Sequence, residues 1–206
     1  MKCYTVKVEC QCSQVEGELK NISPQSGNHI KCMCIDCQTF AHFLEKNEAL
    51  LDRNGATELF QISPSQITFT KGVENIKALR LSSKGPFRWY TKCCQTPIAN
   101  TIGLDKDFAG VFVEFMKFEE DHFSKQDALG EIKYYCMAKY SKGEPPAGAT
   151  QGFPRSLFFK VALKLLLGKL TKNYLPNPFF NEENGLPVNE CEVLEKEKRQ
   201  LLRKRC

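Results

Sequence analysis

The stretch "IKCMCIDCQTF", residues 30–40, holds three cysteines within six positions: Cys32, Cys34 and Cys37. On an extended strand, side chains two residues apart point to the same face, so Cys32 and Cys34 can reach one point in space. Cys37 comes after these two, where a turn can bring it back toward them. Three thiols spaced in this way indicate a metal site, a reactive thiol centre or a disulfide, and the remaining cysteines decide among these alternatives.

Two more clusters flank the central one, "CQC" at residues 10–12 and "CC" at residues 93–94. Cys10 and Cys12 share one face of a strand by the same rule. Cys93 and Cys94 are adjacent, and adjacent residues of a regular strand face opposite ways, so both can bind one ion only where the chain turns. Pro97 and the polar "QT" before it favour such a turn. The seven cysteines therefore divide into four from the outer clusters and three from the middle one.

The cysteine content and the N-terminus favour metal binding over disulfides. The chain has 206 residues and 11 cysteines. The number of cysteines is odd, and their density is too low for a small disulfide scaffold. Its first residues, "MKCYTVKVEC", contain no apolar segment typical of a secretory signal, so we expect a cytoplasmic protein. Zinc prefers tetrahedral thiolate ligands, four in a structural site and three in a site with an open position. We therefore expect two zinc ions, with metal-free reactive thiols or a disulfide as the alternatives.

The charge pattern argues against nucleic acid as a partner. The net charge is +5, and the 29 basic and 24 acidic residues are mostly interspersed. A basic patch interleaved with aromatic residues is typical of nucleic-acid binding, and none is visible in the sequence. An apolar run of about 20 residues, which a membrane-spanning helix needs, is also missing.

The hydrophobic pattern predicts a mainly β domain over residues 1–140. Residues 3–9 alternate as a strand does, and two more strands lead through residues 17–34 into the middle cluster. Residues 38–51 have helical spacing, and short runs rich in β-branched and aromatic residues predict strands between 58 and 99. The apolar segment "FAGVFVEFMKF", residues 108–118, predicts one further strand.

Residues 141–206 form a second region with a different composition. "SKGEPPAGATQGFP" is typical of a linker, the apolar segment 155–170 predicts a helix with lysines on one stripe, and residues 192–205 predict a charged helix. The apolar helix could dock on the β domain, on a second subunit in a homodimer, or on a membrane surface. We call residues 141–206 the C-terminal extension.

The three cysteine motifs resemble those of the glutathione-dependent formaldehyde-activating enzyme family, which also includes centromere protein V. That family shows Cys-x-Cys-Gly, then Cys-x-Cys-x-x-Cys, then Cys-x-x-Cys-Gly-[Ser/Thr]-Pro. This chain has "CQCS" (10–13), "CMCIDC" (32–37) and "CCQTP" (93–97) in the same order. The resemblance covers roughly residues 3–115, and within the family it is greatest to a branch marked by "RWYTKCCQTPIANT" and a C-terminal "NPFF".

The resemblance implies a β-tent, a fold of packed and strongly bent antiparallel sheets. It implies a structural zinc on Cys10, Cys12 and Cys94. It also implies a catalytic-type zinc on Cys32, Cys34 and Cys37. Enzymes of this family are carbon–sulfur lyases linked to joining formaldehyde with glutathione, so a small thiol such as glutathione is the expected partner.

This chain departs from the family pattern at specific positions. Thr91 stands where the third motif begins with Cys, so the structural site lacks its usual fourth ligand unless Cys93 or Cys3 supplies it. Two motif glycines are replaced by Ser13 and Gln95. Two functions follow as hypotheses: a lyase acting at the middle cluster, or a non-catalytic zinc module whose helical arm binds a partner. A ligand from His42 or Asp36 that closes the middle site would favour the module.

Overall fold

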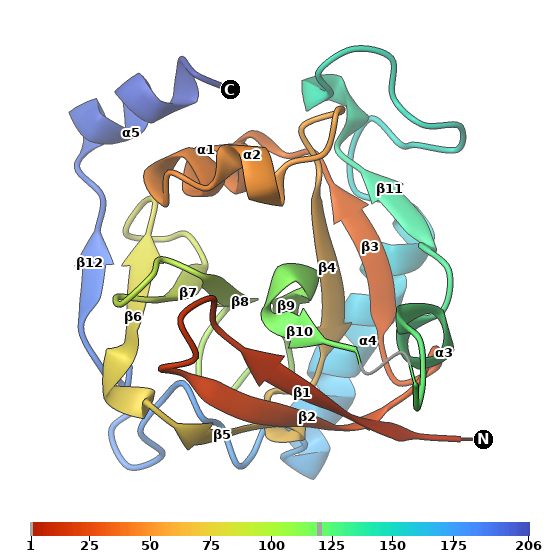
Figure 1. Ribbon diagram of the computed structural model, residues 1–206, viewed down its shortest axis with the longest axis vertical. Coiled ribbons are helices and arrows are strands. Elements are labelled where there is room, and N and C mark those ends of the chain that lie inside the picture. Colours follow the sequence, from red (N-terminus) through yellow and green to blue (C-terminus); the bar gives the residue numbers. More distant parts are fainter. Residues whose placement is uncertain (1, 119–120) are drawn as a thin grey trace.

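The computed structural model describes residues 2–118 and 121–206 and shows two β-sheets with helices against one of them (Figure 1). The four-stranded sheet has the order β10 (Met116–Lys117), β1 (Tyr4–Glu9), β2 (Glu16–Ile22), β5 (Ile67–Lys71). The eight-stranded sheet has the order β11 (Tyr134–Cys136), β3 (Asn28–Cys32), β4 (Thr57–Ile62), β9 (Ala109–Phe112), β8 (Pro97–Thr101), β7 (Phe87–Thr91), β6 (Ile76–Arg80), β12 (Cys191–Val193). The predicted mainly β fold with C-terminal helices is confirmed. Two pairs at the sheet edges, β11 with β3 and β12 with β6, are parallel, and the others are antiparallel.

Three of the crossings between the two sheets are made by single 3-10 turns. Pro64–Gln66 leads from β4 to β5, Val73–Asn75 from β5 to β6, and Val113–Phe115 from β9 to β10. The one strand expected over residues 108–118 was therefore wrong, because the turn at Val113–Phe115 sends its second half into the other sheet. Gly72 precedes the second turn with φ +75°, and a Cβ there would lie 1.9 Å from the carbonyl oxygen of Gln14.

The main core fills the space between the two sheets. Trp89 is fully buried there, and its indole Nε1 donates to the Thr101 hydroxyl at 2.7 Å. Phe179 and Phe180 of the C-terminal extension enter the same core, with ring centroids 4.9 Å and 5.5 Å from that of Trp89. The extension thus completes the packing between the sheets.

A second core lies on the opposite face of the eight-stranded sheet, beneath α1 (Ile35–Phe43). It contains Ile30, Leu59, Phe112, Cys32 and Cys37. The helix expected over residues 38–51 is divided into α1 and the single turn α2 (Asn47–Leu50), because the chain takes a left-handed conformation at position 45. The middle cysteine cluster is therefore part of a hydrophobic layer.

α4 (Arg155–Thr171) and α5 (Lys196–Arg203) reach this layer through Leu157 and Leu202, whereas α3 (Lys125–Leu129) packs into the main core through Ala128 and Leu129. α5 rests on α1, with Leu202 buried and Arg203 Nη2 2.5 Å from Asp36 Oδ1. α4 matches the predicted helix at 155–170. The three-residue strands β11 and β12 and the short helix α3 were missed from the sequence because they are too brief to show a period. Among the described residues, no helix has the length and apolarity to cross a membrane.

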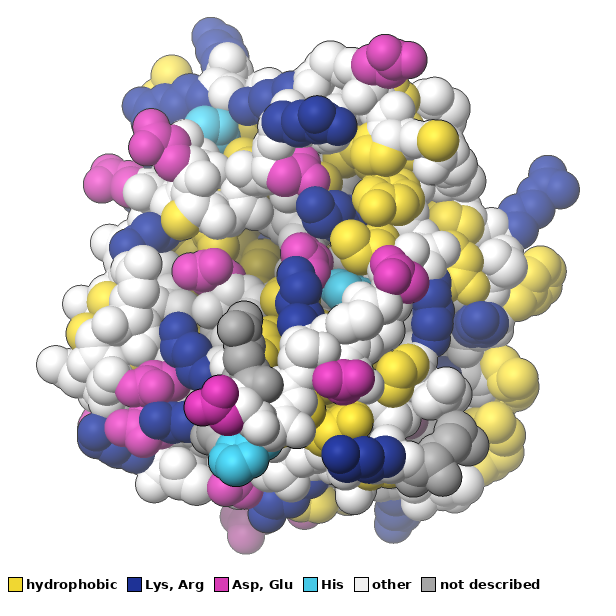
Figure 2. All heavy atoms as spheres, turned by 45° about the vertical axis from the view of Figure 1, so that its right-hand side comes forward, with side chains coloured by type: hydrophobic (Ala, Val, Ile, Leu, Met, Phe, Trp, Pro, Cys, Tyr) yellow, Lys and Arg dark blue, Asp and Glu magenta, His cyan; other side chains and the backbone are white. Residues whose placement is uncertain are grey.

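α4 lies on the protein surface with one side inward and the other in contact with solvent. Its inward side holds Leu157 and Gly168, and a Cβ at Gly168 would come within 2.3 Å of Asp107 Cβ. A glycine is needed at this point because the helix backbone closely approaches the loop that carries Asp107. Hydrophobic side chains gather along the right margin of Figure 2, to which the rear of Figure 1 has turned.

Truncating Phe179 tests whether the extension belongs to the core. Phe179→Ala should lower the free energy of unfolding by about 3–5 kcal/mol, because it removes a fully buried ring and leaves a cavity against Trp89. Leu186→Ala is the control, since Leu186 is 61% exposed and its loss should change stability by no more than about 0.5 kcal/mol. Chemical denaturation measures both. Equal stability of the two variants would contradict the shared core.

Candidate metal centres

The outer clusters meet at one point. The Sγ atoms of Cys10, Cys12, Cys93 and Cys94 all lie within 4.8 Å of one another. Cys12 is 3.3 Å and Cys10 is 3.9 Å from Cys93, Cys10 is 3.6 Å from Cys12, and Cys93 is 3.8 Å from Cys94. We call this group the four-thiol centre.

These distances fit a tetrahedral thiolate site. Ligands about 2.3 Å from a tetrahedral ion stand about 3.8 Å from one another, and the four sulfurs approach that spacing. Cys93 rather than Cys3 joins the other three, because Cys3 is exposed before β1 and lies outside the group. Thr91, which stands where the resembling third motif has a cysteine, is the last residue of β7.

Two tight loops bring the four thiols together. The β1–β2 loop is closed by the Ser13 amide, which donates to the Cys10 carbonyl at 3.0 Å. The β7–β8 loop is closed by the Gln95 amide, which donates to the Thr91 carbonyl at 2.8 Å. Ser13 and Gln95 both adopt left-handed conformations, with φ of 57° and 56°. These are the positions where the resembling motifs have glycine, the residue that adopts such a φ without strain.

Hydroxyl groups stabilise the thiolate form of Cys94. Thr91 Oγ1 lies 3.3 Å and Thr96 Oγ1 3.1 Å from its Sγ. Burial raises the pKa of Cys94, but hydrogen bonds from the two hydroxyls and from the Cys12 backbone lower it to about 5. The Thr96 amide donates to Thr91 Oγ1 at 3.0 Å, which leaves the Thr91 hydroxyl hydrogen for the sulfur. Thr91 is thus not a candidate metal ligand itself, but its hydroxyl stabilises the thiolate of Cys94.

The middle cluster forms a second centre at the start of α1. Cys32 ends β3, Cys34 is the N-cap of α1 and Cys37 lies in its first turn. Their Sγ atoms lie within 4.8 Å of one another, and the Cys37 amide donates to Cys34 Sγ at 3.3 Å. The partial positive charge of a helix N-terminus favours thiolates at this place. We call this group the three-thiol centre.

The three-thiol centre is nearly enclosed. Cys32 is 8% and Cys37 is 4% exposed, and Cys34 is half-buried. The thiols of Cys32 and Cys34 hydrogen-bond to Cys37, and together with the charge of Arg88 they hold its pKa well below the ordinary value despite burial. The centre is therefore built to keep a thiolate in an apolar layer.

Arg88 is a buried charged residue that acts electrostatically on this centre. It lies on β7 and is 4% exposed, and its charge helps the hydrogen bonds from Cys32 and Cys34 to lower the pKa of Cys37. Its Nη1 donates to Asn100 Oδ1 at 3.2 Å, and its guanidinium stands 5.5 Å from the Phe40 ring centroid. Among the described residues no carboxylate forms an ion pair with it, and its buried Nε has no hydrogen-bond partner.

The segment "RWYT" predicted core packing for the aromatic pair Trp89 and Tyr90, and both are buried. It gave no prediction for Arg88, which is buried in the same strand. A charged residue in such a run was the available signal for a buried anionic neighbour, since guanidinium groups are rarely fully buried without one.

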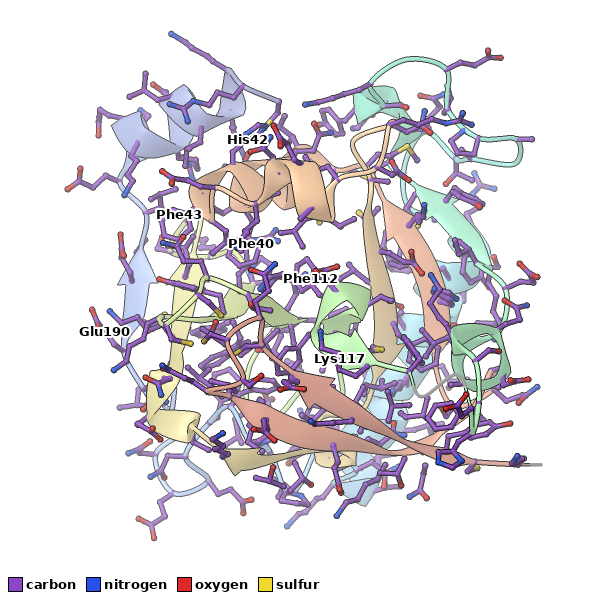
Figure 3. All side chains as sticks on the ribbon, viewed as in Figure 1. Phe40, His42, Phe43, Phe112, Lys117 and Glu190 are labelled. Carbon is purple, nitrogen blue, oxygen red and sulfur yellow. The ribbon has the colours of Figure 1, made fainter. Side chains whose placement is uncertain are left out.

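Neither His42 nor Asp36 closes the three-thiol centre. Figure 3 shows His42 above α1 and Phe40 below it, directed toward Phe112. Asp36 is engaged by Arg203 at 2.5 Å. Gln38, which follows Cys37, donates from Nε2 to the backbone carbonyls of Met33 and Tyr140. The three donors of the centre are the cysteine thiols, and among the described residues no fourth cysteine, histidine or carboxylate joins them.

Replacing cysteines one at a time tests the ligand set of the four-thiol centre. Cys93→Ser should remove about one bound metal ion per chain, because three thiols and a neutral hydroxyl hold the ion more weakly. Cys3→Ser should leave the metal content unchanged. Elemental analysis of protein purified without added metal measures both. Loss of metal in Cys3→Ser alone would assign the fourth position to Cys3.

The chain matches the profile of a protein family and is similar to a solved structure. A crystal structure of a Rhodobacter sphaeroides protein is similar at 15% identity, with a TM-score of 0.39, over 57% of this chain and 95% of that chain. A search of curated proteins found no match. The profile of one family, described as "Family of unknown function (DUF6151)", matches residues 2–192. The match spans both sheets, both thiol centres and most of the C-terminal extension, and the chain belongs to this DUF6151 family.

Proposed function

We propose that the protein binds two zinc ions and acts as a carbon–sulfur lyase on a thiol adduct of an aldehyde, as in the formaldehyde-activating family whose motifs it resembles. The four-thiol centre holds the fold, and the three-thiol centre carries the chemistry. The observation that supports this most directly is the buried Arg88 beside three thiols that have no fourth cysteine, histidine or carboxylate donor among the described residues.

Charge balance links Arg88 to a metal. A buried guanidinium without an anionic partner is strongly unfavourable, and no carboxylate of the described residues supplies that partner. Three thiolates around one divalent ion leave one negative charge, which the single positive charge of Arg88 balances. Three neutral thiols would leave Arg88 uncompensated in the apolar layer.

The reaction that suits this site is the reversible addition of a thiol to an aldehyde. A carbon–sulfur bond forms between the thiol sulfur and the carbonyl carbon, and the thiol proton ends on the carbonyl oxygen. Zinc bound by three thiolates supplies a Lewis acid with an open position. The three cysteines would hold the ion, and Arg88 would stabilise the negative charge around it.

Aromatic side chains enclose the same layer. The rings of Phe43 and Tyr90 stand edge to face at 5.8 Å, and Phe40 lies 6.2 Å from Tyr90. Burial raises the pKa of Tyr90, which keeps its phenol protonated. Such a wall excludes water, which strengthens the electrostatic effect of Arg88 on the thiolates.

The burial of the three-thiol centre favours a second function. Cys32 and Cys37 are each less than a tenth exposed, which leaves little room for a substrate. In this second function zinc has a structural role alone and holds α1 against the sheet. The protein would then be a non-catalytic zinc module whose C-terminal arm binds a partner. Measured activity separates the two functions.

Changing Arg88 tests the charge argument. Arg88→Met should weaken metal binding at the three-thiol centre by roughly 10–100-fold, the usual effect of removing a supporting group around a metal. Arg80→Met is the matched control, because Arg80 stacks on Phe87 at 4.6 Å in the neighbouring strand but faces no thiol centre. Competition with a chromophoric chelator measures the affinity. An unchanged affinity in a folded Arg88→Met protein would contradict the charge balance.

Zinc content and activity together test the lyase. Wild type should contain about two zinc ions per chain and Cys32→Ser about one, because the two centres share no ligand. Wild type should accelerate the exchange of glutathione and formaldehyde with S-hydroxymethylglutathione, as followed by NMR, and Cys32→Ser should lose that acceleration. Two zinc ions without any acceleration would leave only the zinc module.

A further inference from the structure

One side of α4 exposes a continuous set of large apolar side chains. Their exposed fractions lie between 49% and 75%, and the residues are Phe158, Phe159, Leu163, Leu166, Leu167 and Leu170. At 100° per residue these six span one half of the helix, opposite Leu157 and Gly168. We call this set the outer face of α4.

A helix that is apolar all round is normally covered on every side. The β domain covers only the side of α4 that carries Leu157 and Gly168. Apolar patches of this extent mark interaction surfaces in folded proteins. The outer face therefore has the character of a docking surface.

The charges around the outer face are all of one sign. α4 contains Arg155, Lys160, Lys164 and Lys169 and no acidic residue, and Lys172 follows its last turn. By helical geometry Lys160 and Lys169 lie at the two edges of the outer face, and both are exposed. Long lysine stems can lie along an apolar surface while their ammonium groups reach outward.

Of the acidic groups near α4, one is paired with a lysine and the other is buried, with no hydrogen-bond partner for its Oδ1 among the described residues. Asp105 Oδ2 lies 2.7 Å from Lys106 Nζ, and Asp107 is buried beneath Gly168. An antiparallel pairing of two copies about the middle of α4 would bring Arg155 of one copy near Lys172 of the other. We call Arg155, Lys160, Lys169 and Lys172 the basic rim. Its positive charge disfavours pairing with a second copy and is complementary to an anionic surface.

We propose that the outer face of α4 docks on the surface of a lipid bilayer that contains anionic lipid. The two phenylalanines and four leucines enter the boundary between headgroups and acyl chains. Arg155, Lys160, Lys169 and Lys172 contact the anionic headgroups. The helix lies in the plane of the membrane surface, and the rest of the protein stays on the aqueous side.

Flotation with vesicles tests this docking on the full chain. Zinc-loaded protein is mixed with vesicles of phosphatidylcholine alone or with about one-third phosphatidylserine, and the fraction that floats is measured. Wild type should float with the anionic vesicles, and the combined change Leu166→Glu and Leu170→Glu should lower partition at least roughly tenfold. Leu201→Glu on α5 is the matched control, since Leu201 is 61% exposed and lies away from the outer face.

A second variant tests the basic rim. Lys160→Gln combined with Lys169→Gln should lower partition roughly tenfold, and added salt should have a similar effect on wild type. Thermal unfolding and zinc content of each variant should stay close to wild type, because the leucines and Lys169 are exposed and Lys160 loses only its contact with Tyr134, whose ring centroid lies 5.6 Å from the Lys160 Nζ. Wild type that stays unbound to both vesicle types, or equal flotation with both, would overturn the proposal. So would a wild-type dimer that the leucine changes convert to a monomer, because that result assigns the face to a second copy.

Discussion

The convergence of four thiols from two different sheets is the constraint on which the architecture depends. Cys10 and Cys12 come from the loop between β1 and β2 of the four-stranded sheet, and Cys93 and Cys94 come from the loop between β7 and β8 of the eight-stranded sheet. A tetrahedral ion at this point would tie the two sheets together where no strand passes between them. Covalent crossings between the sheets lie elsewhere, at the three 3-10 turns and at the connection from β2 to β3.

The two thiol centres differ in their surroundings. The four-thiol centre lies at two loops, with Cys12 exposed and hydroxyl groups of Thr91 and Thr96 beside Cys94. The three-thiol centre lies in an apolar layer beneath α1, where the charge of the buried Arg88 helps to lower the pKa of Cys37. An ion at the first would be held by two loops that backbone hydrogen bonds already close. An ion at the second would be held by a helix and a sheet that pack together around it, which is the rigid support that a reactive site requires.

The C-terminal extension serves the fold and the surface at once. Phe179 and Phe180 fill the core between the sheets, and α5 covers α1 through Leu202. α4 contributes little to either core and presents its apolar side outward. This division explains why one extension contains both fully buried aromatic residues and strongly exposed ones.

The sequence by itself determined the local elements and the grouping of the cysteines. Alternation predicted β1, helical spacing predicted α4, and same-face spacing paired Cys10 with Cys12 and Cys32 with Cys34. The segment at residues 108–118 was read as one strand because an apolar run has the same pattern whether it is straight or bent by a 3-10 turn.

Only the tertiary structure decided which groups meet. Cys93 rather than Cys3 completes the four-thiol centre because the β7–β8 loop faces the β1–β2 loop. The tertiary structure likewise showed that Arg88 is buried and that the outer face of α4 is exposed. A sequence period shows which side chains share a face, but burial, charge compensation and exposure depend on what the fold places opposite that face.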